Sequence, residues 1–466
     1  KPVKLVMGKY LSSILRKLCE FGPVKPVLML CKEKEFLMRN YNKFLGVAVA
    51  TFAAVALPTV AFAQELPEHG VYIMNSVLFL MAGFLVMFMA CGFCMLEAGL
   101  VRAKNTTMQL TKNMALFSIA AVGYYLMGYN LMYPLGDWSI QGYFSGLFPA
   151  VAVMEAVGVS ADAADDIGYA TTGSDYFFQL MFCAATASIV SGALAERIKL
   201  WPFLIFSVIL TGFIYPIQAS WKWGGGFLEK LGFYDFAGSS LVHSVGGWAA
   251  LIAVWLLGAR IGKFGKNGKS LVIFGHNIPF ATAGVLILWL GWFGFNGGSV
   301  LSADPSLTSL TLVTTSLAAA AGGMAAMSCS FMWYKNLDLT MFLNGILGGL
   351  VGITAGADIM SPGSAIIIGA IAGILIVFAI AALDKLRLDD PVGAIPVHLV
   401  CGVWGSLAVC IFGKKAGFDQ FLIQVSGVAV ISAFCLISSF IILFTLKKTL
   451  GIRVSKTEEL DGLDSA

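Results

Sequence analysis

Apolar residues along this chain gather into eleven segments of roughly 20 residues, separated by shorter stretches that carry the charged side chains. A membrane-spanning helix needs about 20 consecutive apolar residues, whereas a strand of a membrane barrel alternates polar and apolar positions over about ten residues. The pattern therefore predicts an all-α polytopic membrane protein with eleven transmembrane helices. The segments cover approximately residues 72–96, 110–132, 175–195, 200–218, 239–258, 275–297, 307–332, 340–357, 363–383, 392–412 and 421–446.

The composition supports this interpretation. Of 466 residues, 58% are hydrophobic and 12% are charged, which excludes an ordinary water-soluble domain. The 52 glycines allow helices to pack closely within the lipid bilayer. The nine cysteines follow no disulfide or zinc-binding spacing, and Cys91 and Cys94 lie in an apolar segment where small residues pack. We expect no cofactor, no metal site and no nucleic-acid partner.

The N-terminal part reads as a targeting segment. Residues 38–63 combine a short basic stretch, an apolar stretch interrupted by Pro58, and Ala-Phe-Ala before Gln64, which is typical of a secretory signal peptide cut after Ala63. The alternative is a retained first helix. Residues 1–37 are expected to be a non-native or mis-called extension. Residues 64–446 would then form the membrane domain, and 447–466 a short C-terminal tail.

Basic residues in the connections set the expected orientation. Loops on one side, together with the tail, carry sixteen Lys and Arg residues, and loops on the other side carry only Lys222, Lys230, Lys414 and Lys415. Because cytoplasmic loops are enriched in Lys and Arg, the mature N-terminus is predicted outside the cell membrane and the C-terminus inside. The signal peptide predicts the same orientation independently.

A doubled motif predicts the internal symmetry. The pattern D-x-x-G-x-x-x-V-H-x-V-x-G occurs at residues 235–247 and again at 390–402. The first copy opens the fifth span and the second opens the tenth. Because a unit of five spans reverses the direction of the next unit, we predict two inverted five-helix repeats plus a final helix. Inverted repeats are typical of transporters, whose sites lie between the halves near the membrane midplane.

The motif also predicts where its histidines lie. Eight helical residues rise about 12 Å, so each histidine would lie about that deep in an apolar layer about 30 Å thick. Entering from opposite faces, His243 and His398 would meet near the middle. Ionisable residues at that depth usually mark a conduction path, although a packed, hydrogen-bonded histidine is the alternative. Asp235, at the opening of the fifth span, would cap the helix, stabilise a nearby cation, or do both.

Several longer stretches resemble the ammonium transporter family (Amt/Mep/Rh), in particular its bacterial Amt-type members. They are MLEAGLVRAKN (95–105), SGALAERIKLWP (191–202), WKWGGGFLEKLGFYDFAGSSLVHSVGG (221–247), GWFGFNGGS (291–299), LNGILGGLVGITAG (343–356) and DDPVGAIPVHLVCGVWG (389–405). The resemblance covers nearly the whole mature chain. It implies a homotrimer in the cell (inner) membrane, with one pore in each subunit.

The resemblance also implies roles for individual residues. His243 and His398 match the paired pore histidines, and Asp235 matches the family's essential aspartate. The implied ammonium-recognition residues are Trp223, Ser299, Phe182 and Asp235; Phe182 and Phe295 match the stacked gate, and Phe178 matches another vestibule aromatic. Taken singly, a phenylalanine in a span is more often a packing residue, and a tryptophan near an interface is more often a membrane anchor.

These residue types suit ammonium. An aromatic face attracts a cation by roughly 0.5–2 kcal/mol, and a serine oxygen accepts a hydrogen bond that potassium cannot donate. We expect a transporter, not an enzyme, that recognises ammonium (or methylammonium) outside, deprotonates it and conducts ammonia past the histidine pair, with separate proton transfer as an open alternative. An ammonium sensor is the rival. Related tails continue past the GLD at 462–464 and dock a PII-type regulator, which is a further candidate partner.

Overall fold

The computed structural model of this chain describes residues 68–134, 136, 138–146 and 169–465, and every regular element in these ranges is a helix. The predicted signal peptide and the segment before it lie outside the described residues, as do residues 147–168 of the connection after the second span. The main helices are α3 (Glu68–Leu100), α4 (Thr106–Gly123), α5 (Tyr129–Met132), α7 (Thr172–Ala193), α8 (Leu200–Ile209), α9 (Tyr215–Ser220), α10 (Phe227–Leu231), α11 (Val245–Leu257), α12 (Ile278–Gly298), α13 (Pro305–Tyr334), α14 (Leu339–Thr354), α15 (Pro362–Lys385), α16 (Cys401–Ile411), α17 (Phe418–Thr449) and α18 (Lys456–Asp461).

Short turns of other helix types complete these segments. Four π-helical turns adjoin α-helices. Of these, η2 (Tyr124–Gly128) joins α4 to α5 and η3 (Leu210–Ile214) joins α8 to α9, whereas η4 (Ser239–Ser244) and η5 (Ile395–Val400) begin the segments that continue as α11 and α16. Two 3₁₀ turns are η1 (Ala103–Asn105) and η6 (Leu463–Ser465). Single π turns are rare inside helices and often mark functional positions.

The helices agree with the predicted spans. Within the described residues, nine helices are long and apolar enough to cross a membrane. The segments predicted at 340–357 and 392–412 form the shorter apolar helices Leu339–Thr354 and Ile395–Ile411. The prediction of an all-α, multi-pass membrane protein is confirmed. The number eleven depends on counting these two shorter helices as spans.

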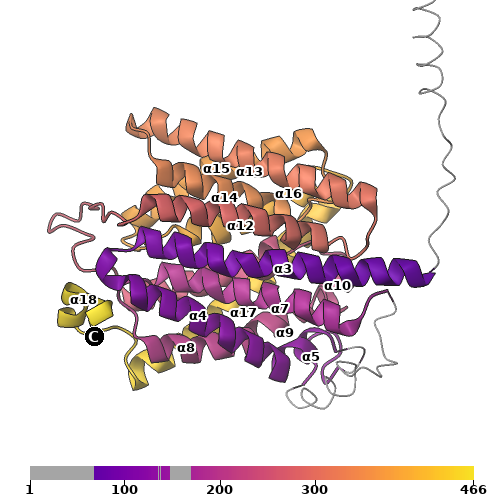
Figure 1. Cartoon of the computed structure of the whole chain (residues 1–466), viewed down its shortest axis with the longest axis horizontal. Helices are drawn as coiled ribbons and strands as arrows, with labels where there is room; N and C mark the ends of the chain where they lie inside the picture. The colour runs from indigo at the N-terminus through magenta and orange to yellow at the C-terminus, as the bar shows by residue number, and fades with distance from the viewer. Residues whose placement is uncertain (1–67, 135, 137, 147–168, 466) are drawn as a thin grey trace, which may run out of the picture. The chain divides into compact units, whose positions relative to one another are not determined.

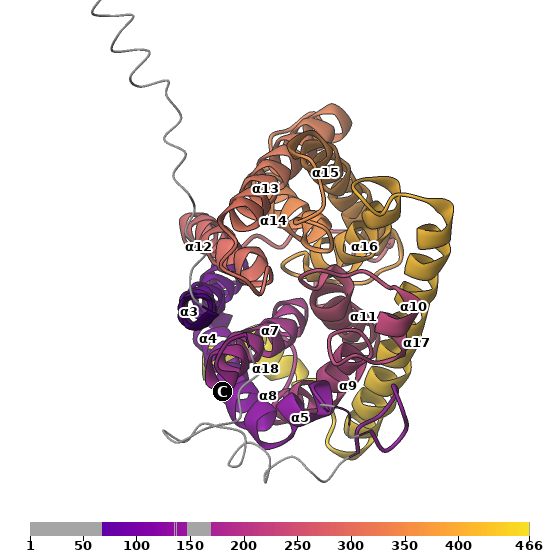
Figure 2. The same cartoon turned by 90° about the vertical axis from the view of Figure 1, so that its right-hand side faces the viewer.

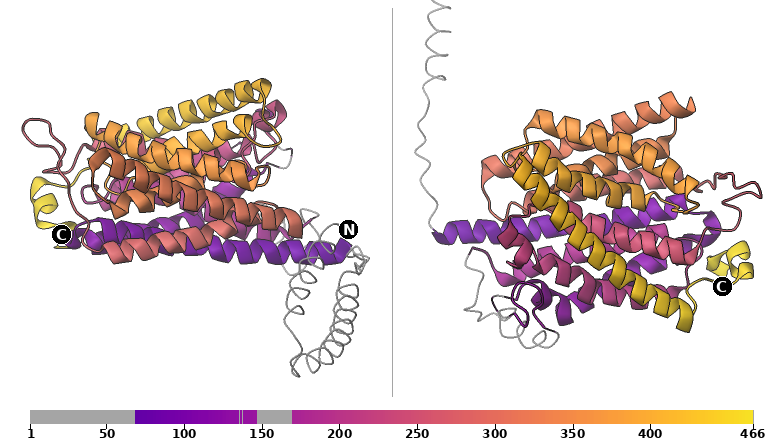
Figure 3. Two further views of the ribbon diagram at one scale, coloured as in Figure 1. Left: turned by 90° about the horizontal axis from the view of Figure 1, so that it is seen from above. Right: turned by 180° about the vertical axis from the view of Figure 1, so that it is seen from behind.

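The helices lie alongside one another in a bundle with two distinct ends (Figure 1). Residues 221–231, which include α10, lie at one end, called here the Trp223 end, and residues 450–465, which include α18, lie at the other, called the tail end. Viewed along the bundle, α3 to α11 occupy one half and α12 to α16 the other (Figure 2). The long α17 crosses the bundle obliquely (Figure 3) and packs on α11 and α16. Each half contributes one helix with the histidine motif, so both motifs face the boundary between the halves.

Short polar side chains fix where several helices begin. Thr171 caps α7 by accepting the backbone N–H of Ser174, and Asn277 caps α12 by accepting that of Phe280. Asp304 accepts two backbone N–H groups at the start of α13. Such caps satisfy amide donors that have no partner within the helix, so these starts follow from the local sequence.

Glycines let the helices of the second half approach to backbone contact. A Cβ on Gly369 of α15 would lie 2.1 Å from the carbonyl oxygen of Ala318 on α13, and one on Gly373 would lie 2.1 Å from that of Gly322. No side chain fits at such positions unless a helix moves. The close approach therefore depends on the absence of a side chain.

Replacing Gly369 with alanine is expected to lower stability, because its methyl group must displace the α13 backbone. Overpacking of this kind typically costs about 1–3 kcal/mol. Gly363→Ala on the same helix is the matched control, since the nearest atom to its Cβ, Ser361 Oγ, is 3.9 Å away. Thermal unfolding of the purified protein in detergent should show a lower midpoint for Gly369→Ala than for Gly363→Ala. Equal midpoints would contradict the packing argument.

Candidate functional site

The first copy of the motif forms a capped π-helical turn. The Oδ1 atom of Asp235 accepts the backbone N–H groups of Gly238 and Ser239 at 3.0 and 2.8 Å. Its Oδ2 atom accepts those of Ser240 and Leu241 at 2.8 and 2.9 Å. Gly238 has a φ of 109°, a left-handed conformation that glycine adopts without strain. The chain then enters η4, which carries His243.

The second copy repeats this construction. Asp390 accepts the N–H of Gly393 at 3.1 Å through Oδ1 and that of Ile395 at 2.7 Å through Oδ2. Gly393 has a φ of 80°, and the π turn η5 that follows carries His398. The fixed Asp and Gly of the motif therefore have a local explanation: the carboxylate holds the helix start, and the glycine makes the turn into it.

The last glycine of each copy brings the two motif helices together. A Cβ on Gly247 would lie 2.6 Å from the backbone nitrogen of Leu399, the residue after His398. A Cβ on Gly402 would lie 3.1 Å from the backbone nitrogen of Ser244, the residue after His243. The contact is reciprocal, as two inverted repeats require. Backbone meets backbone beside each histidine, so the main chain sets the separation of the two rings.

The two imidazoles lie in contact. The Nδ1 atoms of His243 and His398 are 3.2 Å apart, and the ring centroids are 5.2 Å apart. The residues are 0% and 3% exposed. Because one Nδ1 must donate and the other accept, the two rings carry opposite tautomers when both are neutral. The Nε2 atom of His243 is buried and has no hydrogen-bond partner among the described residues, so its hydrogen-bonding capacity is unused within the protein.

Aromatic rings form a continuous column that leads to the histidines. Phe178 and Phe182 of α7 have centroids 4.8 Å apart, and Phe182 stacks on Phe295 of α12 at 3.9 Å with an interplanar angle of 18°. Phe295 in turn lies 5.2 Å from the ring of His243. All three phenylalanines are buried. The stacked pair thus separates the histidines from the Trp223 end with an apolar barrier.

Trp223 and Ser299 are only half-buried, whereas the three phenylalanines of the aromatic column are buried. The Trp223 ring lies 6.1 Å from that of Phe182, and its Nε1 donates to the backbone carbonyl of Asp235 at 3.1 Å. The Ser299 hydroxyl donates to the carbonyl of Phe295 at 2.8 Å, which leaves its oxygen lone pairs available as acceptors. All eight residues singled out from the sequence are therefore joined by direct contacts.

The Asp235 carboxyl does not face open space. It is fully buried, and both oxygens are occupied by backbone amides. Burial raises its pKa to about 6, although the four backbone hydrogen bonds act in the opposite direction. The Asp235 carboxyl therefore holds the start of η4, and the backbone carbonyl of Asp235 holds the Trp223 ring. Any effect of Asp235 on a cation at the Trp223 end would act through its charge and not through direct contact.

Sequence reasoning missed two aromatic residues that contact the histidines. Trp292 of α12 stacks on His243 with centroids 4.8 Å apart and donates to Thr354 Oγ1 at 2.8 Å. It lies one helical turn before Phe295, a spacing that could have identified it. Phe93 of α3 lies 6.0 Å from His398. Nothing in its apolar surroundings in the sequence distinguishes it from other packing residues.

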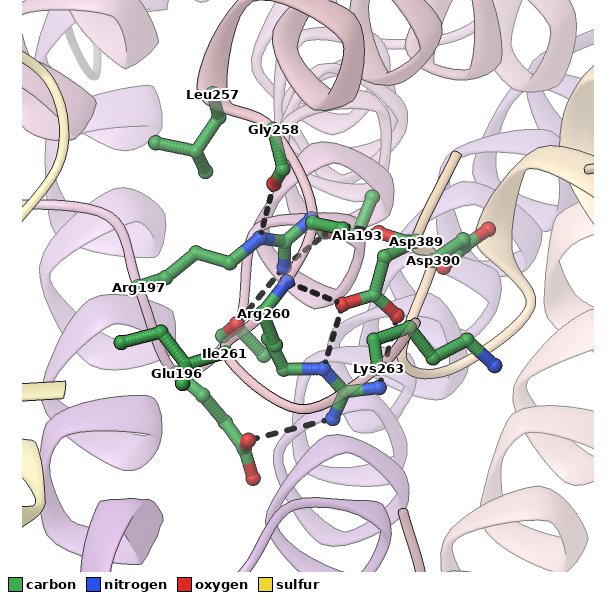
Figure 4. Close-up of polar contacts among 12 residues, drawn as sticks. Ala193, Glu196, Arg197, Leu257, Gly258, Arg260, Ile261, Lys263, Asp389 and Asp390 are labelled. Carbon is green, nitrogen blue, oxygen red and sulfur yellow. Dashed lines mark hydrogen bonds and ion pairs between the residues drawn. The ribbon is translucent and has the colours of Figure 1, made fainter. Parts of the chain in front are cut away.

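A buried ion network joins the two halves at the tail end (Figure 4). Arg197, which follows α7, donates to the carbonyls of Gly258 and Asp389 at 2.9 and 2.6 Å. Arg260 forms two hydrogen bonds from its guanidinium to the Asp389 carboxylate and lies 3.3 Å from Glu196 Oε2. Burial opposes the charge on Asp389, but the bonds from Arg260 and the charges of Arg197 and Arg260 prevail and lower its pKa to about 2. Because Asp389 precedes Asp390, this network also fixes the start of the second motif.

The sequence and fold of this chain are similar to those of known proteins. The model of the Ammonium Transporter Family matches residues 77–466. The chain belongs to the ammonium transporter family. Relatives in this family include the ammonium transporter Amt2 of Archaeoglobus fulgidus, 40% identical over 87% of this chain and 89% of the relative. The ammonium transporter Amt2 of Haloferax mediterranei is 38% identical over 84% of this chain and 88% of the relative.

Solved structures of the ammonium transporter family show the same fold. A structure described as a sensor Amt protein has a TM-score of 0.80 and 34% identity, covering 85% of this chain and 99% of its own. Mep2 of Candida albicans has a TM-score of 0.74 and 25% identity, covering 84% and 89%. The resemblance drawn from the motifs is therefore confirmed. Because the named relatives are transporters, the expectation that this chain is not an enzyme is also supported.

Proposed function

We propose that this chain is an ammonium transporter that binds the cation at the Trp223 end and conducts ammonia through the histidine pair. The observation that supports the proposal most strongly is the contact between two buried imidazoles, 3.2 Å apart at Nδ1, behind a stacked phenylalanine pair. A chain of titratable rings is unusual inside an apolar bundle and suits a substrate that can gain or lose a proton.

Recognition takes place where the site is half-buried. The Trp223 and Phe182 rings provide cation–π attraction of about 0.5–2 kcal/mol. The free lone pairs of Ser299 accept an N–H from ammonium, while potassium and sodium have no hydrogen to donate. Because ammonium is close to potassium in size, these hydrogen bonds and the later proton loss provide the selectivity.

Passage requires that the charge be removed. An ion entering the buried space between Phe182 and Phe295 loses its hydration, which costs several kcal/mol. Ammonium avoids this cost by giving up its proton near the gate. Neutral ammonia then passes the histidines, whose ring nitrogens can hold it by donating and accepting hydrogen bonds. The proton either stays behind or follows along the two rings.

The remaining expectations complete the proposal. The Trp223 end faces the outside of the cell membrane and the tail end faces the cytoplasm, as the distribution of basic residues favours. The chain assembles as a homotrimer with one pore per subunit. A PII-type regulator docks on the cytoplasmic face, and no resident cofactor takes part.

An ammonium sensor is the second candidate, because one similar solved structure is described as a sensor Amt protein. A sensor would use the same vestibule to bind ammonium but would pass the signal to a partner. The two functions differ in whether substrate crosses the membrane.

Proteoliposomes that contain only this protein distinguish the two. After an ammonium jump, solid-supported-membrane recording and an internal pH dye should report charge movement or an internal pH change. A potassium jump of equal ionic strength, and empty liposomes, should give neither signal. Ammonium binding to the purified protein with neither signal would favour the sensor. Equal responses to ammonium and potassium would contradict the recognition mechanism.

A further inference from the structure

A small cavity lies beside His398 and contains a carboxylate. It has a volume of ≈ 10 Å³, which is room for about one water molecule. Its lining includes His398, Glu97 near the end of α3, Ser188, Asn344 and Val392. An imidazole and a carboxylate thus share a space that fits one small hydrogen-bonding molecule. The transport mechanism above makes no use of Glu97.

One oxygen of Glu97 is fully engaged and the other is open. The Oε2 atom accepts hydrogen bonds from Asn113 Nδ2 at 2.7 Å, from Ser191 Oγ at 2.9 Å and from Gln109 Nε2. No described residue donates to Oε1. A Cβ on Gly192 would lie 3.2 Å from this oxygen, so the glycine leaves space next to it. The carboxylate is therefore oriented by one oxygen and presents the other as an acceptor.

A buried lysine balances the charge of Glu97 without pairing with it directly. Lys112 and Glu97 are each 1% exposed. Ser191 links them, because Lys112 Nζ donates to its backbone carbonyl at 2.9 Å while its hydroxyl donates to Glu97. An isolated buried charge is very costly. The positively charged side chain of Lys112 is nearby but does not bond to Glu97. The Glu97 carboxylate can therefore exist charged, and it can also accept a proton without breaking an ion pair.

We propose that Glu97 receives the proton that leaves the histidine pair, through one water molecule in this cavity. The inference rests on the proposed transport function and deepens it, since it gives the proton a route to the cytoplasm that is separate from that of ammonia. The other ionisable groups around the carboxylate are His398 on η5, Lys112 on α4, Cys94 one turn earlier on α3, and Arg197 beyond Lys112. Among these, only His398 lines the cavity with Glu97.

The transfer balances bond by bond. Ammonium loses one N–H as its proton forms an N–H bond at the unpaired Nε2 of His243. The Nδ1–H of His243 breaks as the proton moves to Nδ1 of His398, and the Nε2–H of His398 breaks as its proton moves to the water. The water passes one of its own protons to Glu97 Oε1. The new O–H later breaks when a water or ammonia molecule from the cytoplasm takes the proton. Before the next cycle, water takes the Nε2 proton of His243 and returns one to its Nδ1, and takes the Nδ1 proton of His398 and returns one to its Nε2, which restores the first tautomers.

The variant that tests this is Glu97→Gln. Its carbonyl can occupy the place of Oε2 and keep the three hydrogen bonds, while its NH₂ group faces the cavity and cannot take a proton. We expect the maximal ammonium-evoked current to fall by about tenfold or more, with an unchanged half-saturating ammonium concentration, since recognition occurs at the Trp223 end. Glu97→Asp, which restores a carboxyl, should recover part of the current.

The matched control is Glu68→Gln, the same chemical change at an exposed position of the same helix, which should leave the current unchanged. A wild-type maximal current in a folded Glu97→Gln protein would overturn the inference and leave the proposed function intact. A wild-type protein that gives neither an ammonium current nor an internal pH change would instead overturn the proposed function, whereas an internal pH change without current would overturn only this inference. If Glu97 had a purely structural role, Glu97→Gln would lower the yield and thermal stability of the protein. It would not lower the maximal current while leaving the half-saturating ammonium concentration unchanged.

A measurement on the unmodified chain keeps the proposal testable if Glu97→Gln does not fold. Infrared difference spectra of the wild-type protein in lipid, recorded as ammonium is washed in, should show a protonated-carboxyl C=O band. The band should shift on hydrogen–deuterium exchange and move in the Glu97→Asp variant. No change in the carboxyl region during turnover, or a band unaffected by Glu97→Asp, would overturn the inference.

Discussion

Replacing both His243 and His398 with leucine is expected to abolish ammonium uptake. The two rings are ionisable groups in contact with the inner end of the aromatic column, and leucine can neither take a proton nor hold ammonia. Loss of a positioned acid–base group typically slows proton transfer by about 10²–10⁴-fold. We therefore expect methylammonium uptake and ammonium current to fall by at least about 100-fold in the double variant.

The double replacement is also expected to leave the fold intact. Removing both partners of a buried hydrogen bond together, in favour of apolar groups of similar shape, is often nearly neutral for stability. His69→Leu, at an exposed position at the start of α3, is the control and should transport normally. Full activity of a correctly folded double variant would refute the role proposed for the histidines.

Asp235→Ala is expected to be the most destabilising single change near the site. It leaves four buried backbone N–H groups without an acceptor, and each such group costs about 1–3 kcal/mol. Since these amides begin η4, His243 would lose its fixed position, and transport should fail along with stability. Asp304→Ala removes an exposed cap with two N–H partners and should cost only about 1 kcal/mol.

The effect of Asp235 should also depend on pH. Its folded pKa, raised by burial to about 6, lies above the ordinary value of 3.8. Between these values the folded state binds the proton more tightly than the unfolded state does. The stabilisation that comes from the shifted pKa of Asp235 is therefore fully present below about pH 4 and is lost as the pH rises through 6. The difference in melting temperature between wild type and Asp235→Ala should therefore widen as the pH falls from 7 to 5. A constant difference, or one that narrows, would contradict this account.

Much of the architecture could be predicted because it depends on hydrophobicity and on a repeated motif. Apolar length located the spans, and the spacing between Asp235 and His243, repeated at Asp390 and His398, predicted two rings at similar depth. Two spans were harder to delimit, because Leu339–Thr354 is short and the tenth span begins with a π turn instead of an α-helix. Hydropathy does not distinguish these helix types.

The aromatic and acidic parts of the site were less predictable. Phe182 and Phe295 are 113 positions apart, and in a chain with 35 phenylalanines only the family resemblance singled out this pair. Their stacking is a tertiary contact that no local pattern contains. Glu97 is the opposite case, since a carboxylate within an apolar segment is a clear local signal. What the sequence does not show is that its partners come from α4 and α7 and that it shares a cavity with His398.

The reciprocal approach of Gly247 to Leu399 and of Gly402 to Ser244 has a consequence for how the protein tolerates its surroundings. The separation of the two rings, which is the hop length in the proposed proton transfer, is fixed where peptide groups touch inside the bundle and not by the side chains that face lipid. Changes in bilayer thickness, lipid composition or temperature loosen the periphery first, so the hop length should stay nearly constant while the rest of the bundle adapts. In the proposed mechanism, this duplicated half-site would make conduction depend little on the surrounding membrane.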